Sequence, residues 1–230
     1  MRILVTRPLE DAAETVRLLE ARGHQALAAP LLQTDFHDGA ALTLENVQAV
    51  LATSANGVRA LARRTSRRDV PLFAVGPQTS AMARAAGFLA VRDADGDAKA
   101  LGQAAQSWAE PGKGALLHIR GQERAGALAE NLRHAGFTVI EEILYAVTPL
   151  ALPRAAAEAL RQGELDAALF YSPRSAQVFH ECVLKETLAV DGLIAVCISP
   201  AAESALAPLS FAAIRVAARP NQDALLACLD

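Results

Sequence analysis

Short apolar runs alternate with longer amphipathic stretches along almost the whole chain, and this alternation restricts the possible folds more than any other feature. Most of the apolar runs are continuous, which is typical of strands buried on both faces of a sheet. They are 2–6, 48–53, 72–75, 115–119, 166–171, 194–198 and 214–218. Helical stretches of roughly 10–15 residues separate them, as in βαβ units. The sequence therefore predicts an α/β protein with parallel sheets covered by helices.

The chain also repeats itself at a spacing near half its length. A shift of 113 positions aligns Arg7 with Arg120 and Gly23 with Gly136, and both copies read strand, arginine, turn, helix, glycine, strand. Later blocks repeat in the same order with small gaps. We infer two related α/β units, each with a parallel sheet of about five strands. The long extended segments 24–35 and 137–149 fit strands that connect the units and form a hinge.

Composition and charge narrow the class of protein. Hydrophobic residues make up 52% of the 230 residues, which is enough for a real core, and no stretch approaches a membrane span. The N-terminus lacks the pattern of a signal peptide. Three widely spaced cysteines favour a reducing compartment, and a net charge of −3 argues against a general nucleic-acid binder. We expect a soluble cytoplasmic protein that binds neither nucleic acid nor membrane.

Ligands of parallel α/β sheets bind beyond the carboxyl ends of the strands, where the next helix offers free N–H groups. The turns at these ends are rich in Ser, Thr, Gly and Pro. Capping explains any single turn. As a set, however, the turns bring many backbone donors and five arginines (7, 120, 124, 174 and 219) to the strand ends. This predicts an anion-binding cleft between the units, suited to several carboxylates. The candidate ligand-binding residues are Arg7, Ser54, Ala55, Asn56, Gly76, Thr79, Arg120, Gly121, Ser172, Pro173, Arg174, Ser175 and Ser199.

Several familiar kinds of site are missing from the sequence. It has no GxGxxG after the first strand, no P-loop and no GxSxG, and its scattered histidines and cysteines predict no metal site. His118 lies in an apolar strand run and reads as a core residue. Tyr145 is the most informative single residue. It is predicted either to face a cleft with its hydroxyl or to pack the hinge as a half-buried side chain.

The motifs together resemble the uroporphyrinogen-III synthase family. The matching segments cover essentially the whole chain in order: VTRP at 5–8, TSANGVRAL at 53–61, AVGPQT at 74–79, HIRG at 118–121, ILYAVTP at 143–149, FYSPRSAQVF at 170–179, ISPAAESAL at 198–206 and AARPNQDALL at 217–226. The resemblance implies two flavodoxin-like domains joined by a two-stranded connector. It places 1–35 plus 149–230 in one discontinuous domain and 36–148 in the other.

The resemblance also implies a reaction. The family cyclises hydroxymethylbilane, a linear tetrapyrrole with eight carboxylates, with loss of water and inversion of the last ring, and it uses no cofactor. Its main task is to orient a chain that otherwise closes to the wrong isomer. Tyr145 matches the tyrosine thought to aid departure of hydroxide, and Ser54, Thr79 and Ser172 match polar positions at the cleft. At 199–202 the sequence reads Ser-Pro-Ala-Ala where many relatives have Gly-Pro-Thr, which leaves backbone N–H contacts there.

The resemblance further implies a monomer that meets hydroxymethylbilane synthase transiently to receive its substrate. Two other classes stay open at this point. One is a cytoplasmic two-domain regulator that binds an anion or tetrapyrrole without catalysis. The other is a nucleotide-sugar transferase with two Rossmann-like domains, which would usually need a longer chain.

Overall fold

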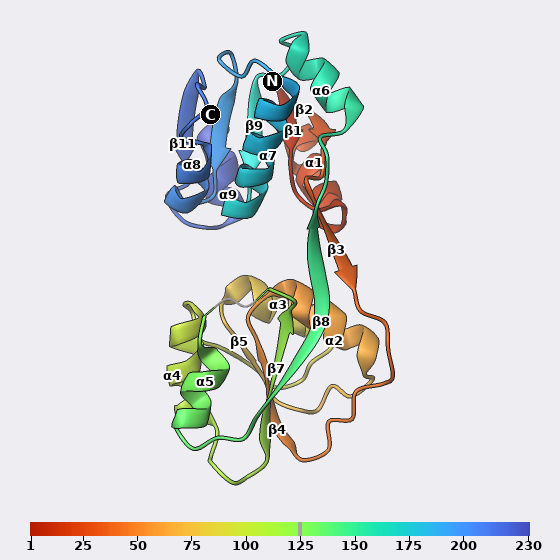
Figure 1. Ribbon diagram of the computed structural model, residues 1–230, viewed down its shortest axis with the longest axis vertical. Helices are drawn as coiled ribbons and strands as arrows, with labels where there is room; N and C mark the ends of the chain where they lie inside the picture. The colour runs from red at the N-terminus through yellow and green to blue at the C-terminus, as the bar shows by residue number, and fades with distance from the viewer. Residues whose placement is uncertain (124–125) are drawn as a thin grey trace. The chain divides into compact units, whose positions relative to one another are not determined.

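The protein, seen here as a computed structural model that describes residues 1–123 and 126–230, folds into two compact units (Figure 1). Unit 1 comprises Met1–Gln33 and Thr148–Asp230, and unit 2 comprises Thr34–Val147. Each unit is built around its own sheet. Within the described residues, no helix is both long and apolar enough to cross a bilayer.

Unit 1 contains a five-stranded parallel sheet with the order β11-β10-β9-β1-β2. Its strands are β1 (Arg2–Val5), β2 (Gln25–Ala28), β9 (Ala167–Phe170), β10 (Ile194–Cys197) and β11 (Ala213–Val216). Counted along the unit, this is the 2-1-3-4-5 order of flavodoxin-like sheets. Its helices are α1 (Leu9–Ala21), α6 (Arg154–Arg161), α7 (Pro173–Glu186), α8 (Pro200–Leu206) and α9 (Gln222–Leu226), followed by a 3₁₀ turn at Ala227–Leu229.

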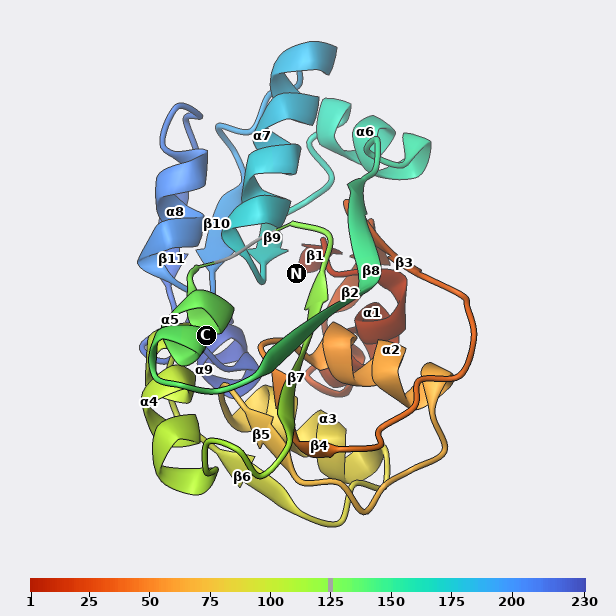
Figure 2. The ribbon, with the colours of Figure 1, turned by 60° about the horizontal axis from the view of Figure 1, so that its bottom comes forward.

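Unit 2 contains a six-stranded sheet with the order β3-β8-β7-β4-β5-β6, in which β4 to β8 are parallel. The strands are β3 (Leu32–Phe36), β4 (Val47–Ala52), β5 (Leu72–Ala74), β6 (Val91–Asp93), β7 (Ala115–Gly121) and β8 (Val139–Pro149). The helices are α2 (Ala55–Arg64), α3 (Pro77–Ala85), α4 (Ala98–Trp108) and α5 (Leu128–His134). Helices α2 and α3 cover one face of the sheet, and α4 and α5 cover the other (Figure 2).

The predicted α/β class is confirmed, and the topology explains the internal repeat. The segment from β1 to β2 corresponds to that from β7 to β8, and β4 to β6 correspond to β9 to β11. Each sheet therefore combines one part of each copy. When corresponding strands of the two copies are matched, the two sheets have the same spatial order. If the strands of unit 2 are numbered along the chain from β4 to β8, without β3, their order in the sheet, read from β6, is 3-2-1-4-5. The repeat alone left open whether the copies exchange strands, and the pairing of β1 with β9 shows that they do.

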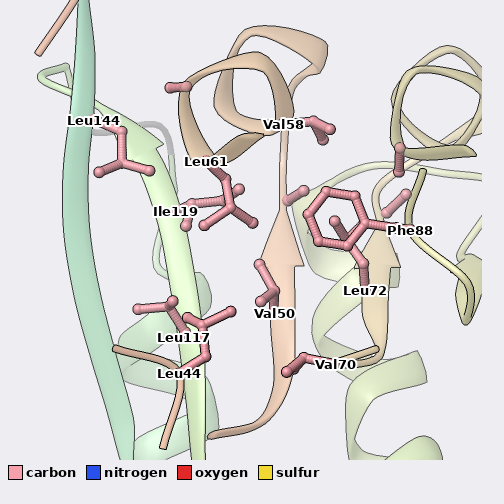
Figure 3. Packing of buried hydrophobic residues seen from close by; sticks show 14 of the residues in the cluster. Leu44, Val50, Val58, Leu61, Val70, Leu72, Phe88, Leu117, Ile119 and Leu144 are labelled. Atoms are coloured by element: carbon pink, nitrogen blue, oxygen red, sulfur yellow. The ribbon is translucent and has the colours of Figure 1, made fainter. Parts of the chain in front are cut away.

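The core of unit 2 fixes where α2 begins. Val50 on β4 and Leu117 and Ile119 on β7 are fully or almost fully buried, and Val58 and Leu61 of α2 pack against them (Figure 3). Truncating one such side chain to alanine typically costs about 2–5 kcal/mol, because a cavity is left behind. This packing holds the amino end of α2 at the carboxyl end of β4.

Strands β3 and β8 each cross the boundary between the units, in opposite directions along the chain. They are neighbours in the sheet order, and the N–H of His37 donates to the carbonyl of Leu144 over 2.8 Å. The extended segment predicted at 24–35 is two strands, because Pro30 lies between β2 and β3 and cannot donate to a ladder. The first of the two strands belongs to unit 1.

Candidate functional site

Unit 2 contains a cavity of about 550 Å³ at the carboxyl ends of β4 and β7. This is the edge of a parallel sheet at which ligands bind. The cavity is lined by Thr53, Ser54, His118, Arg120, Gly121, Glu123, Gly126, Ala127, Ala129, Glu130, Arg133, Glu141 and Tyr145. Four of the predicted site residues are therefore brought together here: Ser54, Arg120, Gly121 and Tyr145.

The hydroxyl of Tyr145 lies 2.7 Å from the hydroxyl of Ser54. Tyr145 comes from the middle of β8 and is only 8% exposed, so its ring is part of the core while its polar end reaches the cavity. The ring is buried in the core of unit 2, whereas the packing alternative expected a half-buried side chain at a hinge. The ring packs, and the hydroxyl is directed to a polar neighbour.

Ser54 is held in place by a second interaction. It is the N-cap of α2, and its hydroxyl oxygen accepts a hydrogen bond from the N–H of Gly57 at 3.0 Å. A hydroxyl has one hydrogen and two lone pairs, so the oxygen can serve the helix and Tyr145 together. The capping geometry fixes the position of the oxygen that Tyr145 contacts.

The charges on the other side of the cavity are mostly paired. Glu141 on β8 accepts from Arg120 Nε at 3.0 Å and from Arg133 Nη2 at 3.0 Å. The side chains of Arg120 and Glu141 are each 14% exposed. Arg120 also donates to the carbonyls of Gly121 and Gln122 at 3.0 and 3.3 Å. Arg120 is thus a partly buried, fixed cation, and an anionic ligand would have to compete with Glu141 for it.

The remaining predicted residues of unit 2 lie outside the lining of this cavity, at the starts of two helices. Ala55 begins α2, and the Asn56 amide donates to the hydroxyl of Thr34 at 3.1 Å. Gly76 is the N-cap of α3 with extended backbone, and Thr79 is buried in the first turn. Predicted Arg124 lies outside the described residues.

In unit 1, two of the three predicted serines are helix caps. Ser172 accepts from the N–H of Ser175 at 3.0 Å at the start of α7, and Ser199 accepts from Ala202 at 3.4 Å at the start of α8. Pro173 is the first residue of α7, and Arg174, which is partly exposed, follows it. Ser175 is buried. Capping explains these hydroxyls, as it does for single turns generally.

Arg7 is directed into unit 1 rather than to its surface. Its guanidinium carbon lies 4.2 Å from the ring centre of Tyr171, its Nη1 donates to Gln222 at 2.6 Å, and its Nη2 lies 3.4 Å from an Asp11 oxygen. The Arg7 side chain is 11% exposed. Burial raises the pKa of Tyr171, and the positive charge of Arg7 acts in the opposite direction. The arrangement joins β1, α1 and α9.

Sequence reasoning missed several residues of the cavity. Glu141 and Arg133 were not singled out, and His118, although buried, lines the cavity as well as the core. One signal was present for Glu141. It is one of two charged residues, with Glu142, in the otherwise apolar segment 139–147, and the structure pairs it with His118 across β7 and β8.

The fold and the cavity define a class: a two-unit α/β protein with a polar cavity at the carboxyl ends of parallel strands. Comparison with known proteins identifies the family. The family described as uroporphyrinogen-III synthase HemD matches residues 13–227, so the chain belongs to the uroporphyrinogen-III synthase family.

Solved structures agree with this fold. Uroporphyrinogen-III synthetase from Helicobacter pylori is 16% identical, with a TM-score of 0.65 and coverage of 100% of this chain and 98% of that chain. A mutant uroporphyrinogen III synthase from Thermus thermophilus is 17% identical, with a TM-score of 0.55 and coverage of 100% and 96%. No curated protein matches the chain in sequence at a significant level.

Proposed function

We propose that the chain converts hydroxymethylbilane to uroporphyrinogen III with loss of water and inversion of the last ring, as a cyclising hydro-lyase that needs no cofactor. The family match over residues 13–227 supports the reaction. The observation that carries the site is the 2.7 Å contact of Tyr145 with Ser54 beside the cavity.

Tyr145 has the chemistry that the first step requires. A phenol hydroxyl can donate its proton to a leaving group. In the proposed step the bond between the terminal methylene carbon and its hydroxyl oxygen breaks, and the oxygen leaves as water with the proton of Tyr145. The substituted carbon of the last ring then attacks this methylene carbon to form a spiro intermediate. The bond from that ring carbon to its original bridging methylene breaks, and the freed methylene forms a new bond to the unsubstituted end carbon of the ring, which inverts the ring. The proton that the ring system loses on closure returns to the phenolate.

Recognition of the substrate carboxylates is assigned to the helix starts and to the fixed arginine. The first turns of α2 and α3 in unit 2, and of α7 and α8 in unit 1, present backbone N–H groups that favour anions. These turns include Ala55, Asn56, Gly76 and Thr79 in unit 2 and Ser172, Pro173, Arg174, Ser175 and Ser199 in unit 1. Pro173 has no N–H and contributes only the conformation of its turn. The packing of Arg7 against Tyr171 supports an indirect contribution, through the shape of unit 1, rather than contact with a carboxylate.

The test is an assay in which hydroxymethylbilane is generated enzymatically and the products are separated into isomers I and III. Formation of isomer III above the uncatalysed background supports the proposal. Isomer I alone, at the background rate, contradicts it. Binding of the tetrapyrrole without conversion would favour the alternative of a regulator, for which neither the family match nor the structure supplies an observation.

A further inference from the structure

Gly121 lies directly against the reactive end of Tyr145. A methyl group placed on Gly121 would come within 2.9 Å of Cε2, 3.0 Å of Cζ and 3.2 Å of the hydroxyl oxygen of Tyr145. Real side-chain contacts are rarely this short, so either the ring or the strand would have to move. Gly121 is not among the glycines with positive φ, which means that its backbone conformation does not require glycine. Glycine is required at this position because the Tyr145 ring occupies the space of a side chain.

The pairing of β7 with β8 explains why the ring lies there. Arg120 pairs with Ile143, but the next residue, Gly121, pairs with Tyr145, so Leu144 is an extra residue on β8. Side chains alternate between the faces of a strand, and one extra residue moves the following side chains to the opposite face. Leu144 and Tyr145 consequently both join the core on the side of α2. That is the side on which Ser54 caps its helix.

We propose that Gly121 and the bulge at Leu144 form the device that positions Tyr145. The bulge turns the ring toward α2. Because residue 121 has no side chain, the ring can approach β7 closely enough for its hydroxyl to contact Ser54. Gly121 is a positioning residue, since it acts through Tyr145. Its effect on catalysis rests on the proposed function, whereas its effect on the tyrosine ring does not.

A side chain at 121 should disturb the site more than the fold. Tyr145 can respond by rotating about its Cα–Cβ bond, and this moves the hydroxyl most because it is farthest from the backbone. A hydrogen bond of 2.7 Å is lost once the oxygens separate beyond about 3.5 Å. The G121A substitution should therefore lower kcat at least about twofold, to the level of Y145F, while KM changes less than about twofold.

The experiment compares wild type with G121A, Y145F and the double variant G121A/Y145F. The chain has two tyrosines, Tyr145 and Tyr171, so tyrosine-labelled protein gives two sets of NMR ring signals, which Y171F assigns. The control is G192A, because a side chain at 192 meets nothing within 4 Å. We expect G121A to shift the Tyr145 signals and leave those of Tyr171 in place. We expect G192A to shift neither set, and G121A/Y145F to be no slower than Y145F.

Several outcomes would overturn the inference: unshifted Tyr145 signals in G121A, a wild-type kcat in G121A, or a double variant much slower than Y145F. If G121A does not fold, removing the ring in G121A/Y145A should restore folding, and failure to do so overturns the inference as well. If the wild-type chain forms no isomer III, the proposed function fails, while the NMR comparison still decides whether Gly121 positions the ring.

Discussion

Tyr145 combines a buried ring with a hydroxyl at the cavity, and these two parts can be separated by mutation. Tyr145→Phe keeps the ring in the core and removes only the hydroxyl. We expect it to lose well over half of the rate of isomer III formation, because the proposed proton donor for the leaving hydroxyl is then missing. Stability should fall by only about 1 kcal/mol, the usual worth of one hydrogen bond. Product separation measures the rate of isomer III formation, and urea unfolding measures the stability. Wild-type turnover with isomer III still formed would remove Tyr145 from the mechanism.

Arg7 is expected to matter for stability. Arg7→Ala removes the cation above the Tyr171 ring and the hydrogen bond to Gln222, and we expect the free energy of unfolding to fall by roughly 1–3 kcal/mol. Arg17→Ala, at an exposed position on α1, is the matched control and should change stability by less than about 0.5 kcal/mol. A higher KM for hydroxymethylbilane at unchanged stability would instead identify Arg7 as a direct substrate ligand.

Cys197, at the end of β10, gives the protein a measurable dependence on pH. Burial raises the pKa of its thiol to about 12. The unfolded thiol has its ordinary pKa of 9.0, so the folded state keeps its full stability relative to the unfolded state below that pH and loses stability as the pH rises toward 12. Between pH 7 and 10 we expect the free energy of unfolding of wild type to fall by roughly 1–2 kcal/mol more than that of Cys197→Ala. Equal falls in the two proteins would show that the thiol ionises in the folded state.

Among the elements, α2 depends on the same serine that contacts Tyr145, and two substitutions separate the roles. Ser54→Ala removes the N-cap and should destabilise the protein by about 1 kcal/mol, whereas Ser54→Gly should cost only a few tenths. Both remove the partner of Tyr145, so both should lower the rate of isomer III formation by the same factor. Thermal unfolding and the product assay test this. Activity that follows stability across the two variants would mean that Ser54 acts only as a cap.

The elements also show how far the sequence could predict this protein. The continuous apolar runs correctly predicted β1, β4, β5, β7, β9, β10 and β11 within one or two residues, because burial on both faces leaves a strong pattern. Strand β6 was missed because it has only three residues, two of them charged. The contact of Tyr145 with Ser54 was beyond prediction. It depends on one extra residue in β8, and a bulge has no reliable signature in a single sequence.

At the scale of the whole molecule, the exchange of strands between the copies makes the halves of the chain interdependent. The fragment 1–113 contains β1 to β6, and 114–230 contains β7 to β11, so each half holds an incomplete part of both sheets. We expect neither fragment to unfold cooperatively alone, and we expect the mixture to regain cooperative unfolding and synthase activity. The cut falls in the exposed turn before β7. Circular dichroism with urea tests this, and a fragment that folds stably by itself would show that the exchange is not obligatory.

The same exchange determines when unit 1 can fold during synthesis. The hydroxyl of Thr6, which follows β1, donates to the carbonyl of Leu169, 163 residues later. At about 5–20 residues per second, the ribosome needs on the order of 10 s to deliver that partner. Unit 2 is contiguous and can fold during this interval, while β1 and β2 emerge before it and keep their apolar surfaces exposed. The segment that contains β1 and β2 is therefore open to chaperones for longer than any part of unit 2.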